Sequence, residues 1–167
     1  MESKIKGKAF VYGDNIDTDR IIPGKFTKTL DLDQLADHVL EDLDPGFRTL
    51  AEVGDIVVGG ENFGCGSSRE QAPLALKAFG VSCVIARSFA RIFYRNAINI
   101  GLPLLEISDH KINAGDEIVV ELGQGIVTTP DDVHRVKPMP DVMISILDAG
   151  GLVPFLRDGG GDWLERR

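Results

Sequence analysis

Hydrophobic residues recur with two different periods along the chain. A first strand is expected at 6–11, short apolar runs typical of buried strands lie within 55–58 and 81–86, and 103–106 is strand-like. Apolar residues every three or four positions predict a helix at 32–43, and further helices are expected at 89–99, at 140–149 and from the end of the loop at 60–68 to about 79. Within 32–43, the shared face consists of Leu32, Leu35, Val39 and Leu43. Three of these helices are expected to end at a following glycine: Gly80, Gly101 and Gly150.

The order of these segments predicts the fold class. Strands and helices alternate from 55 to 106, which predicts parallel pairing with right-handed crossover connections. Two later strands, at 117–122 and 125–129, are joined by a Gly-Gln pair and predict an antiparallel hairpin. A short extended segment is expected at 21–23. We therefore expect an α/β fold with helices flanking a mixed sheet or a small barrel-like β part.

Length and charge limit the possible partners. The 167 residues fit one domain over 1–167, with three consecutive glycines marking a tail at 158–167 that is expected to be loose at its start. A net charge of −8 argues against nucleic acid, since phosphate contacts need clustered cations. No apolar run approaches a membrane span, and the start shows no signal peptide. We therefore expect a cytoplasmic protein with neither a membrane nor a nucleic-acid partner.

The chain has two cysteines, Cys65 and Cys83. Two thiols make no disulfide framework and fit a reducing compartment. They are also fewer than the ligands usual for a structural zinc or an iron–sulfur cluster. We therefore expect no cofactor in this chain. Any cluster that the protein works with must take most of its ligands from another chain.

The strongest candidate site is the segment 60–70, which reads GENFGCGSSRE. Its glycines allow sharp turns and a close approach of the backbone to a ligand. Ser67, Ser68 and Arg69 stand where this loop is expected to enter a helix, whose free N–H groups attract anions. Arg69 can bind a carboxylate through two parallel hydrogen bonds. The segment therefore favours a site for a small carboxylic acid.

A purely structural role for these serines is the main alternative. Ser67 lies three residues before Glu70, and Ser68 three before Gln71, so each matches the helix-capping box. Capping explains one serine but not the whole cluster. Pro73 would fall just beyond the first turn of a helix that began at Ser68, which leaves the helix start open. The glycine patterns of dinucleotide-binding loops, P-loops and hydrolase elbows do not match.

Two further segments carry polar residues. The segment 13–20 holds three aspartates without the pattern of a calcium-binding EF-hand, and is either a plain turn or a place where Asp17 or Asp19 orients a catalytic partner. The segment 86–96 reads ARSFARIFYRN, and its three arginines either face solvent or support the loop at 60–70. Its apolar residues are expected in the core: Phe89, Ile92 and Phe93.

Together these segments resemble the small subunit of 3-isopropylmalate dehydratase, an enzyme family of leucine biosynthesis within the aconitase superfamily. The resemblance covers most of the chain and rests on DTDRIIP at 17–23, GCGSSRE at 64–70, ARSFARIFYRN at 86–96 and the segment 140–152, which ends in DAGGL. The last segment points to a stand-alone small subunit. The resemblance implies the swivelling β/β/α domain of aconitase type. It also implies a large-subunit partner that carries a [4Fe–4S] cluster.

The resemblance also implies a reaction and its residues. A hydro-lyase of this kind moves a hydroxyl between neighbouring carbons of a malate-type acid by losing and re-adding water. Ser67 matches the base, held as an alkoxide that a helix N-terminus, Arg69 and a nearby metal would favour. Arg69, beside Ser68, matches the arginine that grips a substrate carboxylate. Asp19 matches an aspartate that pairs with a histidine of the other subunit, and Cys65 matches no cluster ligand.

Substrate choice is expected to depend on the segment 23–29, which resembles the region that reads the variable group. An isopropyl group favours apolar neighbours, whereas a carboxyalkyl group, as in homoaconitate, favours a cation. Lys28, which lies between two threonines, favours the carboxyalkyl group, unless its side chain points to solvent as loop lysines commonly do. Lys25 or Lys28 could replace the carboxylate-binding arginine that aconitase has in this region. Both isopropylmalate and homoaconitate therefore remain candidate substrates.

Two other functional classes make different predictions. A small-carboxylate-binding module would bind its ligand without a partner and without catalysis. A structural role for the serines predicts that Ser67→Ala lowers stability by about 1 kcal/mol and leaves turnover unchanged. The enzyme hypothesis predicts a loss of activity with little change in folding.

Overall fold

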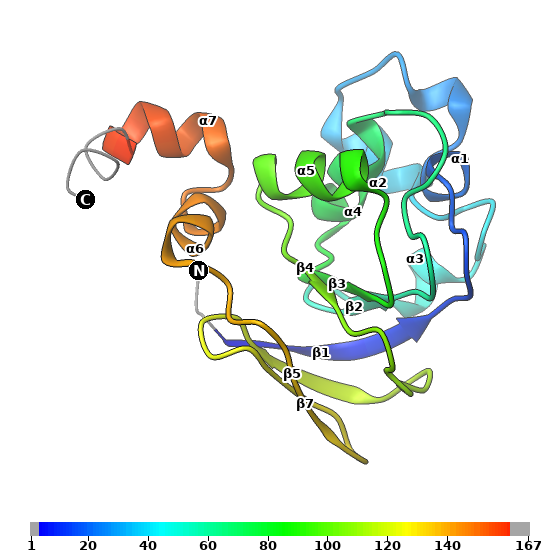
Figure 1. Ribbon diagram of the computed structural model, residues 1–167. Coiled ribbons are helices and arrows are strands. Elements are labelled where there is room, and N and C mark those ends of the chain that lie inside the picture. The colour runs from blue at the N-terminus through cyan, green and yellow to red at the C-terminus, as the bar shows by residue number, and fades with distance from the viewer. Residues whose placement is uncertain (1–3, 161–167) are drawn as a thin grey trace.

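The computed structural model describes residues 4–160, and within them seven strands form one sheet in the order β4-β3-β2-β1-β5-β6-β7 (Figure 1). The parallel half consists of β1 (Lys4–Val11), β2 (Ile56–Val58), β3 (Cys83–Ala86) and β4 (Leu104–Glu106). The antiparallel half consists of β5 (Glu117–Glu121), β6 (Ile126–Thr128) and β7 (Val133–Arg135), with β5 antiparallel to β1. This mixed sheet confirms the predicted parallel strands and the predicted hairpin.

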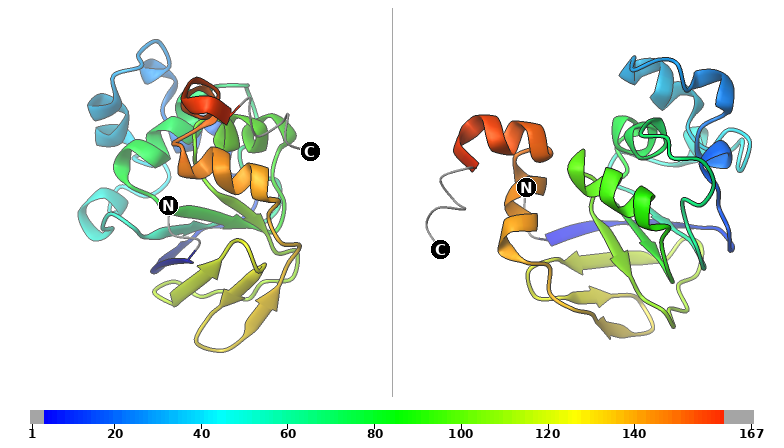
Figure 2. Two further views of the ribbon diagram at one scale, coloured as in Figure 1. Left: turned by 90° about the vertical axis from the view of Figure 1, so that its left-hand side faces the viewer. Right: turned by 45° about the horizontal axis from the view of Figure 1, so that its top comes forward.

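Helices fill the connections between the parallel strands. The crossovers are α4 (Gln71–Phe79) and α5 (Arg91–Asn99). The long β1–β2 connection holds α1 (Thr18–Ile21), the 3-10 turn Gly24–Phe26, α2 (Leu32–His38) and α3 (Phe47–Leu50). The chain continues after the sheet through α6 (Asp141–Asp148), α7 (Leu152–Phe155) and a final turn, Leu156–Gly160. Figures 1 and 2 show α4 and α5 over one face of the parallel strands, while β5 to β7 curl away.

The central parallel strands β2 and β3 are buried on both faces. Val57 of β2 belongs to the cluster under the helices, with Phe47, Phe63, Leu76 and Phe93. Its neighbours Ile56 and Val58 belong to a second cluster, which includes Ile85, Ile118, Val120 and Val127. Successive side chains of a strand point to opposite faces, so burial on both faces explains the unbroken apolar runs at these strands.

The helix predicted over 32–43 is shorter than expected. It ends at His38, after which Val39 is extended (φ −60°, ψ 132°) and Leu40 is left-handed (φ 56°). The Leu40 N–H donates a hydrogen bond of 2.8 Å to the Ile21 carbonyl, so a tertiary contact replaces the next helical bond. Val39 and Leu40 are still fully buried, whereas Leu32 is 50% exposed. Burial, rather than helical period, accounts for this apolar pattern.

Several other predicted boundaries also change. Ile21 ends α1 and is not part of an extended segment, and Ile92 is 51% exposed and not in the core. β7 and α7 were not predicted, because each is too short to show a period. The glycine helix ends are confirmed by left-handed backbone angles at Gly80, Gly101 and Gly150. The start of the predicted loose tail forms the end of the turn at Leu156–Gly160, and 161–167 lie outside the described residues.

No helix within the described part of the chain is long and apolar enough to cross a membrane.

Candidate active site

The candidate site lies where the chain leaves three neighbouring parallel strands. The segment 12–18 follows β1, 59–69 follows β2, and 87–91 follows β3. Ligands of open α/β sheets bind at such carboxyl ends of strands. The first two segments stay paired beyond the sheet through backbone hydrogen bonds that include Asn15 N–H to Glu61 O (2.8 Å), Gly64 N–H to Ile16 O (2.7 Å) and Thr18 N–H to Cys65 O (2.9 Å).

The third segment packs directly on the loop at 60–69. The Phe63 N–H donates to the Ser88 carbonyl, and the Ala90 N–H donates to the Phe63 carbonyl. Gly64 has φ 82°, and a Cβ placed on it would lie 2.2 Å from Cγ of Phe93. Because a side chain at this position would clash with α5 and strain the backbone, glycine is required there.

Neither serine of the loop caps a helix. α4 begins at Gln71, its N-cap position is Glu70, and no side chain caps it. Helix capping, the structural alternative for Ser67 and Ser68, therefore does not occur at α4. The helix start, which the sequence left open, lies at Gln71. Pro73 is the third helical residue, where its missing N–H is not needed.

Thr18 holds Ser67 in place. The buried Thr18 hydroxyl donates to the Ser67 carbonyl at 3.0 Å, and the two hydroxyl oxygens lie 3.4 Å apart. Ser67 and Ser68 themselves are exposed. The backbone of Ser67 is thus fixed while its hydroxyl remains accessible to a ligand.

Ser67, Ser68 and Arg69 line a cavity of about 220 Å³. The first turn of α5, from Ala90 to Phe93, lines the same cavity, with Asn96 one turn further on. No side chain caps α5. A helix N-terminus carries free N–H groups and the positive end of the helix dipole, so this turn favours an anion in the cavity. The volume suits a small acid rather than a nucleotide.

Arg69 forms an ion pair with Asp19 at the edge of this cavity. Nη1 of Arg69 donates to Oδ1 of Asp19, whose side chain is 62% exposed. An exposed pair of this kind contributes at most about 1 kcal/mol, so a substrate carboxylate can compete for the arginine. The structure therefore places Asp19 beside Arg69, and Arg69 lines one cavity with Ser67 and Ser68.

The other predicted residues lie elsewhere. Asp17 caps α1 by accepting a hydrogen bond from the Arg20 N–H. Lys25 and Lys28 are exposed and do not line the cavity, and Nζ of Lys25 lies 5.2 Å from the Phe26 ring centroid. Their segment nevertheless starts beside the cavity, since a Cβ on Gly24 would lie 3.3 Å from Nη1 of Arg69.

The three arginines of 86–96 have different environments. Arg91 lines the cavity and makes no ion pair with another residue of 4–160. Arg87 donates to the His110 carbonyl at 3.0 Å, and the buried His110 ring bonds to the Gly59 carbonyl at the base of the loop. Arg95 is exposed. Sequence reasoning did not single out Arg91 as a ligand, although its place just after a parallel strand was the available signal.

The cysteines do not form a metal site. Cys65 is half-buried in the loop, whereas Cys83 is fully buried on β3, where burial raises the pKa of its thiol. Within residues 4–160, no group of three or more His, Cys, Asp or Glu side chains is placed to hold a metal ion. These residues do not fit an iron–sulfur cluster.

Comparison with known proteins first defines the class. The family model described as the aconitase C-terminal domain matches residues 47–110, which include β2, the loop at 60–69, α4, β3, α5 and β4. One solved structure that is similar over nearly the whole chain is a crystal structure of 3-isopropylmalate dehydratase from Methanocaldococcus jannaschii. It has a TM-score of 0.88 and 41% identity, and the match covers 98% of this chain and 99% of that one.

Whole-chain relatives then give the family. The chain is 56% identical over 156 residues to the 3-isopropylmalate dehydratase small subunit of Caldicellulosiruptor bescii, with 91% of this chain and 94% of the relative covered. It is 50% identical over 161 residues to the isopropylmalate/citramalate isomerase small subunit of Methanocaldococcus jannaschii, with 94% and 96% covered. The chain belongs to the family of 3-isopropylmalate dehydratase small subunits. This confirms the resemblance and the aconitase-type fold drawn from the sequence.

We expect Ser67→Ala to leave the free energy of unfolding unchanged within about 0.5 kcal/mol, because Ser67 caps no helix. Asp31→Ala is the positive control, since Asp31 caps α2 and accepts hydrogen bonds from the N–H groups of Asp33 and Gln34. Its loss should lower stability by about 1 kcal/mol. Urea unfolding of the isolated chain measures both. An equal loss in the two variants would restore a structural role for Ser67.

Proposed function

We propose that this chain is the small subunit of a two-subunit hydro-lyase that interconverts 2-isopropylmalate and 3-isopropylmalate, acting in the cytoplasm. The observation that carries the proposal is the cavity between Ser67–Arg69 and the first turn of α5, in a chain 56% identical to a 3-isopropylmalate dehydratase small subunit. Its ligand is a small di- or tricarboxylate, and neither a nucleic acid nor a membrane takes part.

Ser67 is the base in this proposal. Its hydroxyl, with Thr18 fixing the backbone behind it, takes the proton from the substrate carbon next to a carboxylate. Negative charge then builds on that carboxylate, and Arg69 stabilises it through paired hydrogen bonds. The positive end of α5, across the cavity, favours the ionised serine. The sequence suggested that the helix directly after the loop would stabilise the ionised serine. That helix, α4, begins only four residues after Ser67, so in this proposal α5 takes the role instead.

The second half of the reaction needs a Lewis acid for the leaving hydroxyl, and no side-chain group within residues 4–160 is placed to hold a metal ion for this role. We assign it to a [4Fe–4S] cluster in the large subunit. The separated Cys65 and Cys83, and the small-subunit names of the relatives, support this assignment. Asp19 is mostly exposed at the cavity edge, so it is available to pair with a histidine of the large subunit.

Two groups other than isopropyl are candidates for the variable part of the substrate. The Methanocaldococcus jannaschii relative named isopropylmalate/citramalate isomerase small subunit favours a methyl group as an alternative to isopropyl. Lys28 favours a carboxyalkyl group, as in homoaconitate. A carboxylate-binding module without catalysis would not need the accessible serine beside Arg69.

The test is anaerobic reconstitution with the large subunit, assayed on isopropylmalate, citramalate and homoaconitate. We expect turnover only when both chains are present, and a fall of roughly 10³-fold in kcat for Ser67→Ala, the range that a positioned base contributes. Turnover by either chain alone would contradict the proposal, as would an active Ser67→Ala complex. Binding of isopropylmalate without turnover would favour the binding module.

We expect Arg91→Gln to raise KM for isopropylmalate by roughly tenfold or more, because Arg91 is the second arginine on the cavity and the substrate has two carboxylates. Arg95→Gln is the matched control, one turn further along α5 and exposed. Steady-state kinetics of the reconstituted complex measure both. Equal KM values in the two variants would remove Arg91 from the substrate site.

Lys28→Leu should shift the ratio of kcat/KM toward isopropylmalate and away from homoaconitate. The segment starts beside Arg69 at Gly24, so we propose that a cation at position 28 interacts with the second carboxylate of a longer substrate. Competition between the two acids in one reaction measures the ratio. An unchanged ratio would show that Lys28 does not read the substrate.

A further inference from the structure

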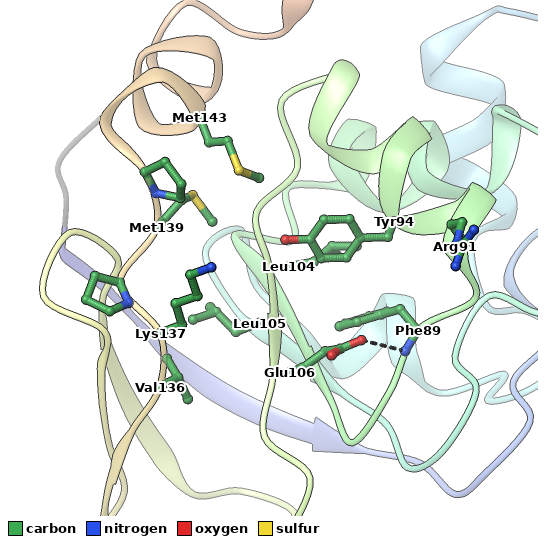
Figure 3. Close-up of a pocket in the computed structure, with 12 residues that line it drawn as sticks. Phe89, Arg91, Tyr94, Leu104, Leu105, Glu106, Val136, Lys137, Met139 and Met143 are labelled. Carbon is green, nitrogen blue, oxygen red and sulfur yellow. Dashed lines mark hydrogen bonds between the residues drawn. The ribbon is translucent and has the colours of Figure 1, made fainter.

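A second, larger cavity lies beside the catalytic one, and we propose that it receives an apolar segment of the large subunit that carries an acidic side chain. This inference rests on the proposed function. It concerns the groove between α5 with β4 on one side and the segment 136–143 on the other (Figure 3).

The groove has a volume of about 620 Å³, nearly three times that of the catalytic cavity. Its lining is mainly apolar: Phe89, Leu104, Leu105, Val136, Met139 and Met143. Figure 3 shows Met139 and Met143 on one side of the groove, opposite Tyr94 and Leu104. Unbranched methionine side chains adapt to different apolar surfaces, which is why they are frequent at binding surfaces.

The groove is continuous with the catalytic cavity. Arg91 lines both, at the first position of α5. The catalytic cavity has to face the large subunit, because that subunit supplies the missing Lewis acid. A groove that starts at the same arginine therefore opens on the face that the large subunit covers. This continuity favours a protein segment over a free small molecule as the occupant.

The charges of the groove indicate what this segment carries. Glu106 is already engaged, since its carboxylate accepts a hydrogen bond of 3.2 Å from the Phe89 N–H. Lys137 makes no ion pair with another residue of 4–160, and Figure 3 shows its ammonium group directed into the groove. In a chain of net charge −8, this free cation beside an apolar surface selects an acidic residue of the partner.

The test compares Lys137→Glu with Lys6→Glu, a matched charge reversal at an exposed lysine on β1 that does not line the groove. Sedimentation of the full chain with the purified large subunit gives Kd. We expect Lys137→Glu to raise Kd at least tenfold and Lys6→Glu to leave it unchanged. Met143→Gln should also raise Kd, and circular dichroism checks that each variant is folded. At a saturating concentration of large subunit, the complex with the Lys137→Glu chain should have the same kcat as the unmodified complex.

Unchanged Kd values for folded Lys137→Glu and Met143→Gln would overturn the inference, while an active unmodified complex would leave the proposed function intact. A change in KM at saturating large subunit, without a change in Kd, would place a small molecule in the groove and would also overturn it. If the unmodified chains neither associate nor turn over substrate, the proposed function fails and the inference fails with it.

Discussion

The parallel pairing of β1 with β2 is the constraint on which the site depends. Backbone hydrogen bonds continue this pairing past the ends of the strands, so the segment 13–18 lies along the loop at 60–67. Thr18 and Asp19 come to the loop for this reason, although about fifty residues separate them from Ser67 and Arg69. The Thr18 hydroxyl then fixes the Ser67 backbone, and Asp19 holds Arg69. Backbone pairing thus brings the segments 13–18 and 60–67 together, and the side-chain contacts of Thr18 and Asp19 follow from it.

Close packing against α5 completes the arrangement. The absence of a side chain at Gly64 lets the loop lie on Phe93, and Ser67 and the first turn of α5 line the same cavity. The same turn presents Arg91 to both the catalytic cavity and the neighbouring groove. Under the proposed function, this helix end would contact both the substrate and the large subunit. The two contacts lie close together because Arg91 lines both cavities.

The sequence predicted the parallel strands, the hairpin and the loop at 60–70, because burial on both faces and glycine clusters leave clear local patterns. Prediction from the sequence failed where tertiary hydrogen bonds override the local preference for secondary structure. The segment around Ser67 matches a capping box, yet Thr18 holds the Ser67 backbone and α4 starts at Gln71. Leu40 likewise leaves its predicted helix to bond with Ile21. Arg91 and the groove could not be predicted, since each depends on which strand ends lie side by side.

The central claim is that Ser67 of this chain removes the carbon-bound proton. Solvent deuterium incorporation into 3-isopropylmalate by the reconstituted complex, followed by NMR, tests it most directly. We predict that the unmodified complex exchanges the proton, that Arg69→Lys still exchanges it at raised substrate concentration, and that Ser67→Ala does not exchange it at all. Exchange by a folded, fully assembled Ser67→Ala complex at the rate of the unmodified one would contradict the account and would assign the base to the large subunit.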